Sequence, residues 1–431
     1  MNATAPADSL AARRDRAFGA GSPLFYNTPL HIVRGQGVEL FDPEGRRYVD
    51  MYNNVPCVGH ANPHVAEAMA RQQSTLNVHS RYLHEGIVTF AERLAALHGP
   101  EIESVIFSCS GTEANEVALR MARMATGKAG IVCTNATYHG NSEAVGKMTR
   151  IGSGQNTAGD VRAIPFPEML RPLVPGAGED ELCEAYLDRL RQVIRSFEED
   201  GTGFAGLIVC SIFANEGLPD VPRGFMARAT EIVHEAGGLV IADEVQAGYC
   251  RSGVWWGYDV LGFTPDIVVT GKPMGNGLPL AATAASRKLI ETFRAATRYF
   301  NTFASSPLQA AVGMAVIDVI ERDRLAENVA TVGAFLKAAL AERQGRFASI
   351  ADVRGHGLFI GVEIAKTDAA REPDMDKAVD IINRLKDRGF LTSNAGAYRN
   401  VVKIRPPLVF TQGHAEEFIV AFDATMAEVD G

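Results

Sequence analysis

The sequence lacks the features of a zinc-binding, disulfide-bonded or membrane-spanning protein. Its six cysteines are scattered, none forms a C-x-x-C pair, and no cysteine or histidine spacing suits zinc, so no metal site is predicted. Free thiols in a reducing cytoplasm are the expectation. No apolar run approaches the roughly 18–20 residues that span a bilayer. The basic residues Arg13, Arg14 and Arg16 are not followed by the apolar core of a secretory signal.

The sequence also has no excess of positive charge. Of its 431 residues, 42 are Lys or Arg and 51 are Asp or Glu, which gives a formal net charge of −9. Because nucleic acids and anionic membranes do not favour an acidic surface, neither is an expected partner. The length exceeds that of a usual single core, so we expect more than one domain.

Short apolar runs alternate with helical patterns through the middle of the chain. This alternation is typical of a mainly parallel sheet covered by helices on both faces. The segment 151–181, rich in Gly, Pro and Asp, is predicted to be a long surface excursion. The predicted strands are 105–110, 129–136, 205–214, 239–245 and 266–271, and the predicted helices are 111–127, 180–200 and 226–238.

The pattern changes at about residue 310. A long helix at 305–323, a further helical stretch, VRGHGLFIGVEI, a helix at 375–388 and the strand NVVKIRPPL predict a smaller α+β domain. Residues 37–50 predict a β-hairpin that joins it. We therefore expect an N-terminal segment (1–55) that joins the small domain, a large domain (56–309) and a C-terminal small domain (310–431).

Two segments that follow predicted strands suit parts of a flat, phosphorylated ligand. SCSGTEANE (108–116) begins a helix whose free N–H groups suit a phosphate, with Gly111 allowing close approach and Thr112 adding a hydroxyl. YHGNS (138–142) offers Tyr138 for stacking on a ring. An ordinary helix cap and a packed tyrosine in a turn are the alternatives.

Two further segments place reactive residues at strand ends, where ligands bind in such sheets. Asp243 follows an apolar run, where a carboxylate is costly unless it is paired, and a protonated ring nitrogen is one partner. Lys272, in GKPMGNGLP, has surroundings that can lower the pKa of its amine and make it a nucleophile toward a carbonyl. A strand-end carboxylate and a lysine that reaches water are the alternatives.

Together the four segments supply a phosphate cradle, a stacking ring, an acid for a ring nitrogen and an amine for an aldehyde. Pyridoxal 5′-phosphate has all four complementary groups, so it is the predicted cofactor. The ordinary alternatives would have to coincide in the order and location that this cofactor requires.

From about residue 25 to 425 the sequence resembles the class III aminotransferases, which are fold-type I pyridoxal phosphate enzymes. The motifs that carry the resemblance are LVIADEVQAGYCRSGVWWGYDVLGFTPDIVVTGKPMGNGLP, YHG, SGTEANE, FNTF, VRGHGLFIGVEI and RNVVKIRPPL. NNVPCVGHANPHV and NVHSRYLHE are most similar to the branch with ethanolamine-phosphate phospho-lyases and alanine–glyoxylate aminotransferase-like proteins. The resemblance implies an α/β fold-type I transferase with a large, mainly parallel cofactor-binding domain, and a homodimer with shared active sites.

The resemblance also implies residue roles. Lys272 would carry the Schiff base with the cofactor and shuttle the proton between Cα and C4′, and Asp243 would keep the pyridine nitrogen protonated. The other implied cofactor-binding residues are Ser110, Gly111 and Thr112 at the phosphate, Tyr138 and Val245 on the two ring faces, His139, Gln246 at the ring 3-oxygen, and Thr302 at the phosphate of the neighbouring subunit.

The sequence departs from the family pattern where a substrate carboxylate would bind. Ser211 stands where many members have the Glu of a Glu-Pro pair, Asn141 follows His-Gly where some have Arg, and Lys403 replaces an Arg three residues before the Pro pair. A lysine supplies charge without the bidentate fork of a guanidinium. This departure favours a substrate with a phosphate or without an α-carboxylate. The candidate substrate residues are Tyr52, Arg81, Arg399, Lys403 and Arg405.

The first functional interpretation is transamination, in which a primary amine or amino acid gives its amino group to a 2-oxo acid or aldehyde. The alternative is a phospho-lyase that eliminates phosphate from an O-phospho amino alcohol, and epimerisation would begin with the same proton loss. A cofactor-binding protein without activity is a further class, against which the intact Lys272 and Asp243 argue.

Overall fold

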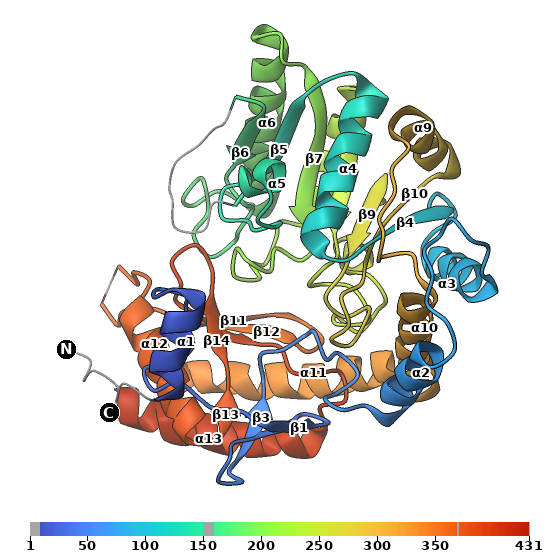
Figure 1. Ribbon diagram of the computed structural model, residues 1–431. Helices are drawn as coiled ribbons and strands as arrows, with labels where there is room; N and C mark the ends of the chain where they lie inside the picture. The colour runs from blue at the N-terminus through green and yellow to red at the C-terminus, as the bar shows by residue number, and fades with distance from the viewer. Residues whose placement is uncertain (1–8, 150–158, 369, 431) are drawn as a thin grey trace.

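The structure is a computed structural model that describes residues 9–149, 159–368 and 370–430. A large sheet with its helices forms the upper half in Figure 1, and two small sheets with the C-terminal helices form the lower half. The strands are β1 (Arg34–Gln36), β2 (Glu39–Phe41), β3 (Arg47–Asp50), β4 (Ser104–Ser108), β5 (Gly130–Thr134), β6 (Val161–Ile164), β7 (Phe204–Cys210), β8 (Leu239–Asp243), β9 (Ile267–Thr270), β10 (Ala281–Ala285), β11 (Ile350–His356), β12 (Phe359–Ile364), β13 (Phe390–Leu391), β14 (Ser393–Ala395) and β15 (Val401–Ile404). The helices are α1 (Leu10–Phe18), α2 (Pro63–Gln73), α3 (Glu85–Ala96), α4 (Gly111–Thr126), α5 (Glu143–Gly146), α6 (Glu179–Glu199), α7 (Phe225–Glu235), α8 (Gly257–Leu261), α9 (Arg287–Thr297), α10 (Pro307–Arg322), α11 (Leu325–Glu342), α12 (Met375–Asp387) and α13 (Gln412–Asp430), with a short 3₁₀ turn η1 (Arg343–Gly345).

The large sheet has seven strands in the order β4-β10-β9-β8-β7-β5-β6. β8 is parallel to β7 and β9, and β5 is parallel to β6 and β7, while β10 runs antiparallel to both of its neighbours. The predicted mainly parallel sheet is therefore confirmed. The prediction of one strand at 205–214 is too long, because β7 ends at Cys210 and a turn follows.

The segment 151–181 differs in part from its prediction. Residues 161–164 form β6, which pairs with β5 at the edge of the sheet, so the interpretation as a surface excursion is wrong there. Residues 150–158 lie outside the described residues. Residues 165–178 form an irregular loop that leads into α6.

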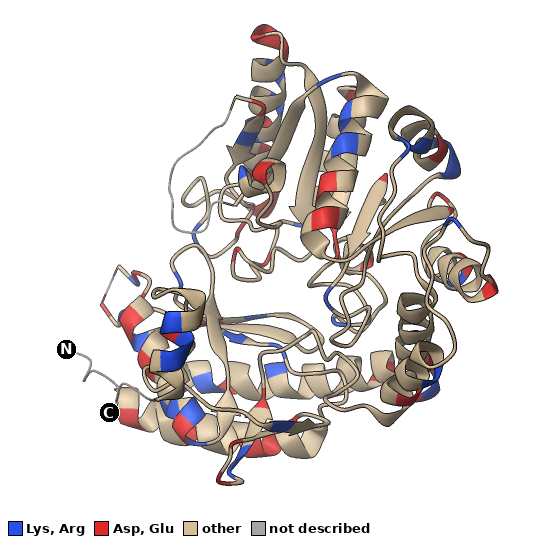
Figure 2. Cartoon of the chain, viewed as in Figure 1, with Lys and Arg blue, Asp and Glu red and all other residues tan. Residues whose placement is uncertain are grey.

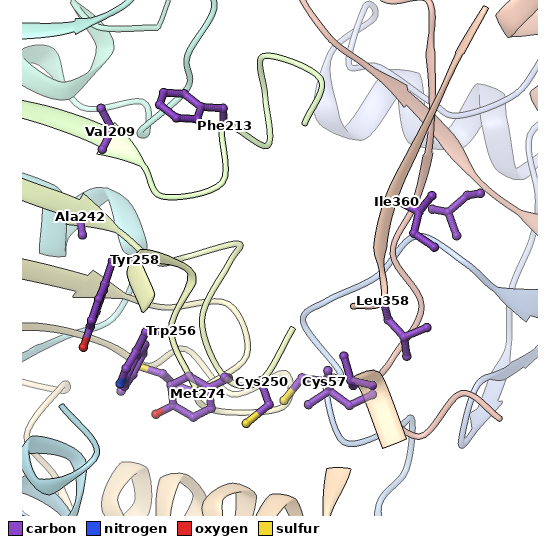
Figure 3. Packing of buried hydrophobic residues seen from close by; sticks show 14 of the residues in the cluster. Cys57, Val209, Phe213, Ala242, Cys250, Trp256, Tyr258, Met274, Leu358 and Ile360 are labelled. Atoms are coloured by element: carbon purple, nitrogen blue, oxygen red, sulfur yellow. The ribbon is translucent and has the colours of Figure 1, made fainter. Parts of the chain in front are cut away.

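Helices cover both faces of the large sheet, and side-chain alternation along the strands decides which face each residue meets. Ile241 of β8 lies in one hydrophobic cluster with residues of α4, while Val240 and Ala242 lie in another with residues of α6 and α7. This second cluster also reaches Leu358 and Ile360 at the start of β12, so the core is continuous between the two halves (Figure 3).

The smaller half combines both ends of the chain. β2 and β3 form the predicted hairpin, and β3 pairs in parallel with β13, so the N-terminal segment joins the C-terminal part. The second small sheet has the order β11-β12-β15-β14. The exact domain boundaries at 56 and 310 stay predictions.

Within the described residues, no helix is long and apolar enough to cross a membrane. Acidic and basic residues are interspersed along the helices of both halves (Figure 2). All six cysteines are free, as the scattered spacing predicts.

Candidate active site

The carboxyl ends of three strands meet at one cavity of about 310 Å³. Asp243 is the last residue of β8, Lys272 follows β9, and Ser110 caps α4 just after β4. Nine of the ten predicted cofactor-binding residues line this cavity: Ser110, Gly111, Thr112, Tyr138, His139, Asp243, Val245, Gln246 and Lys272. The tenth, Thr302, is exposed and does not line it.

The start of α4 forms one wall of the cavity. Ser110 Oγ accepts the Glu113 N–H at 3.2 Å and Glu113 Oε2 accepts the Cys109 N–H at 2.8 Å, a reciprocal cap that fixes this turn. The N–H groups of the first residues of a helix have no partner within it, so those of Gly111 and Thr112 are suited to an anion. A Cβ on Gly111 would lie 2.9 Å from Val245 Cγ2, so only glycine leaves room there.

Asp243 is held by three nitrogen atoms. Its Oδ2 lies 2.7 Å from His139 Nδ1 and accepts a hydrogen bond of 3.0 Å from Asn115 Nδ2, and its Oδ1 accepts the Val245 N–H at 3.0 Å. Asn115 also donates to the His139 carbonyl oxygen at 2.9 Å. The carboxylate is thus oriented at the rim of the cavity, where it suits a protonated ring nitrogen. Sequence reasoning missed Asn115, although this residue lies in the SGTEANE motif.

The Lys272 side chain lines the cavity and is exposed to the open space there. Surrounding protein desolvates the amine, and the positive charge of Arg405 disfavours a second cation, so the pKa of Lys272 is lowered. A lowered pKa increases the neutral, nucleophilic form of the amine. No hydrogen bond from its Nζ to another described residue competes with a ligand.

These residues fit pyridoxal phosphate. One cavity is lined by the Lys272 amine, by the Asp243 carboxylate with its hydrogen-bond donors, and by the start of α4, where Gly111 lies against Val245. Its size suits a small cofactor.

A second cavity of about 410 Å³ adjoins the first and shares Tyr138, Asn215, Gln246 and Lys272 with it. Four of the five candidate substrate residues line it, namely Tyr52, Arg399, Lys403 and Arg405. No Asp or Glu is among its described lining residues. The fifth candidate, Arg81, is exposed and lies over the Phe300 ring at 4.1 Å, away from both cavities in the single chain.

Two buried basic side chains share one acceptor in the second cavity. Gln246 Oε1 accepts hydrogen bonds from Lys403 Nζ at 3.2 Å and from Arg405 Nη1. Burial and the nearby charges of Arg405 and Lys272 hold the pKa of Lys403 well below its ordinary value. Gln246 Nε2 donates to Asn215 Oδ1 at 3.0 Å, and Asn215 is a second site residue that sequence reasoning missed.

Two basic groups that lie close together are costly to bury in their charged forms unless an anion pairs with them. Burial also lowers the pKa of Arg405, whose Nε donates to the Tyr52 carbonyl oxygen at 3.0 Å. An anionic ligand group bound between Lys403 and Arg405 would balance this charge. The second cavity is therefore suited to the anionic end of a substrate whose amine lies at Lys272.

Comparison with known proteins agrees with this site. A sequence model described as Aminotransferase class-III matches residues 23–426. The chain belongs to the class III aminotransferase family. Members of this family are pyridoxal phosphate enzymes that act on small-molecule amine and keto substrates. The fold-type I architecture and the cofactor predicted from the sequence are thereby confirmed.

The relatives of this protein include some that are named aminotransferases and some that are named phospho-lyases. An alanine–glyoxylate aminotransferase 2-like protein of Drosophila melanogaster is 34% identical over 96% of this chain and 86% of the relative. An ethanolamine-phosphate phospho-lyase homolog of Caenorhabditis elegans is 30% identical over 97% of this chain and 93% of the relative. A solved phospholyase from Arthrobacter in complex with phosphoethanolamine is 37% identical, with a TM-score of 0.93 over 97% of this chain and 99% of that one.

Proposed function

We propose that this family member is a pyridoxal phosphate-dependent phospho-lyase that eliminates phosphate from a small O-phospho amino alcohol. The observation that carries the proposal is the second cavity, where Arg399, Lys403 and Arg405 adjoin Lys272 and no Asp or Glu is among the described lining residues. A phosphate monoester carries a charge of about −1.5 to −2 at pH 7, against −1 for a carboxylate. The phosphate therefore balances these cations better than a carboxylate does.

Two further points support phosphate elimination over transamination. Lys403 stands where many α-amino-acid enzymes of the family have the arginine that binds a substrate carboxylate by two parallel hydrogen bonds. The solved phospholyase with phosphoethanolamine is similar to this chain over nearly its whole length.

In the proposed mechanism, Gly111 and Thr112 bind the cofactor phosphate, and Asp243 pairs with its ring nitrogen. When bound, pyridoxal phosphate supplies an aldehyde that takes up the amine and a ring that withdraws electrons from the adjacent carbon. Lys272 Nζ removes the proton from the carbon that bears the amine.

The electron pair that stays on this carbon forms a double bond to the neighbouring carbon of the substrate. The bond between that neighbouring carbon and the phosphate oxygen breaks. Phosphate leaves with the bonding pair, held by Lys403 and Arg405, whose positive charges stabilise the charge that develops on the leaving oxygen. The unsaturated amine product takes up water and yields an aldehyde and ammonia.

Transamination is the second candidate. The position of Lys272 suits transamination equally, because the amine that removes the proton from the substrate carbon can return it to a different carbon. The aminotransferase 2-like relative is 34% identical over 96% of this chain. A homodimer with shared sites and a cytoplasmic location belong to either proposal.

A screen that scores two products separates the candidates. Purified protein loaded with pyridoxal phosphate is incubated with phosphoethanolamine, related phospho-amines and unphosphorylated amines with a 2-oxo acid, and released phosphate and keto product are both measured. We expect phosphate, ammonia and aldehyde in equal amounts, and no turnover by Lys272→Ala. Keto product that depends on the 2-oxo acid, without phosphate release from any phospho-amine, would establish transamination instead.

A further inference from the structure

Arg399 lies at the tip of the hairpin formed by β14 and β15. Its side chain lines the second cavity, is exposed, and makes no hydrogen bond or ion pair with another described residue. Its backbone has a positive φ of 57°, and its N–H and carbonyl oxygen bond to Gly396 O at 3.0 Å and Asn394 Nδ2 at 2.9 Å. The position of the guanidinium therefore depends on how the tip, residues 396–400, is held.

Both sides of the tip are fixed by residues outside it. Gly396 N donates to the Asn215 carbonyl oxygen at 3.2 Å. On the other side, Asn400 Nδ2 donates to Glu363 Oε1 at 2.9 Å and to the Ile364 carbonyl oxygen at 2.7 Å. Glu363, a buried carboxylate of β12, is thus a fixed point for the tip.

Arg171, from the loop between β6 and α6, reaches this fixed point from the other half of the molecule. Its Nη1 lies 2.5 Å from Glu363 Oε1, and its guanidinium carbon lies 5.6 Å from the centre of the Tyr398 ring, within the range of a cation–π contact. Arg171 therefore contacts both the anchor of the tip and the residue next to Arg399.

The loop that carries Arg171 is itself attached to the large half. Met169 N donates to the Asp220 carbonyl oxygen at 3.0 Å, and Leu173 N donates to the hydroxyl of Tyr186, a buried residue of α6, at 3.2 Å. These attachments on either side of Arg171 make the contact with Glu363 a link between the two halves.

We propose that Arg171 is a positioning residue, which through Glu363 and Tyr398 holds the β14–β15 tip so that Arg399 binds the anionic end of the substrate. The identity of that anionic end as a phosphate rests on the proposed function, whereas the link itself rests on the contacts above. Arg171 lines neither cavity, so any effect on substrate binding would act through the residues that it positions.

Arg171→Gln removes the ion pair with Glu363 without leaving a buried carboxylate unpaired. Glu363 keeps its buried partner Arg354, which bonds to Glu363 Oε2 and, through its Nε, to the Gly217 carbonyl oxygen at 3.0 Å, so no buried charge loses all its partners. A matched control is Arg384→Gln, which removes an exposed pair with Glu428 (2.8 Å) between α12 and α13, away from the tip.

The experiment uses the full chain loaded with pyridoxal phosphate. For Arg171→Gln we expect the KM for phosphoethanolamine to rise about tenfold, as for one charge-assisted contact, with kcat within about twofold. The spectral response to propylamine, which has no anionic end, should be unchanged, and Arg384→Gln should match wild type. Tyr398→Ala, at an exposed position, removes the same contact from the tip and should raise the KM in the same direction.

If Arg171→Gln and Tyr398→Ala both fold and both keep the wild-type KM for phosphoethanolamine, the inference is overturned. It is also overturned if the response to propylamine is weakened as much as the response to phosphoethanolamine. Its failure is distinguishable from failure of the proposed function by calorimetric titration with inorganic phosphate. If wild type releases no phosphate from phospho-amines, yet inorganic phosphate binds more weakly to Arg171→Gln than to wild type and Arg384→Gln, the elimination is wrong and the positioning role stands.

Discussion

At the scale of single residues, Gly111 packs closely against Val245 in the cofactor cavity, since a Cβ on Gly111 would lie 2.9 Å from Val245 Cγ2. In Gly111→Ala, Val245 would have to move toward the space for the ring. We expect the affinity for pyridoxal phosphate to fall on the order of tenfold, since overpacking costs about 1–3 kcal/mol. Absorbance titration of the cofactor-free protein measures it.

Gly146→Ala is the control for this prediction, because a Cβ there meets no described atom closer than 3.9 Å. Its affinity should equal that of wild type. Equal affinities for all three proteins would contradict the assignment of the Gly111–Val245 contact to the cofactor site.

The sequence could predict which residues at the ends of strands belong to the site. It could not predict residues that reach the site only because their side chains point toward it. Asp243 and Lys272 end or follow apolar runs, so a parallel sheet brings them together whatever the details of packing. Asn115 and Asn215 reach the site only because α4 and the turn after β7 take particular orientations. Nothing in their spacing indicates that contact.

At the scale of elements, the two strands of the large sheet that the sequence did not predict, β10 and β6, have weak local signals. β10 reads AATAA, and alanine has a low preference for strands, yet it lies fully buried between β4 and β9. β6 reads VRAI and is short, at the edge of the sheet. Tertiary pairing forms both strands, so local pattern alone could not predict them.

The loop after β6 carries a carboxyl group that makes stability depend on pH. Burial, with a smaller contribution from Glu363, raises the pKa of Glu168 from 4.5 to about 7, although Arg171 and Arg354 oppose the shift. Between these values the folded chain holds a proton that the unfolded chain has released. This contribution to the free energy of unfolding is therefore complete below about pH 4.5 and is lost as pH rises to about 7.

Glu168→Gln carries no such proton and should remove that part of the pH dependence. We expect the fall in the free energy of unfolding from pH 5 to pH 8 to be smaller in the variant, by on the order of 2 kcal/mol. Urea unfolding at the two pH values measures the difference. An identical pH dependence in the two proteins would show that Glu168 ionises normally in the folded chain.

At the scale of the whole molecule, several exposed apolar residues form a surface next to Thr302. Tyr82, Leu83 and Phe303 are exposed, and His79 lies 5.5 Å from the Phe300 ring, which brings the segments 79–83 and 300–303 together. Asn301 Nδ2 donates to Glu113 Oε2 at 3.1 Å, so this surface adjoins the start of α4. An apolar surface beside a cofactor site is what a homodimer with shared sites requires.

Leu83→Glu tests this assembly, because Leu83 is fully exposed in the single chain and a charge there would have to be desolvated in a dimer. We expect light scattering to show a dimer for wild type and a shift toward monomer for the variant. Affinity for pyridoxal phosphate should fall with it, because Thr302 would no longer reach the neighbouring phosphate. Val420→Glu, an exposed apolar position on α13, should stay dimeric with normal affinity. A Leu83→Glu monomer that binds the cofactor as tightly as wild type would show that each subunit holds a complete cofactor site.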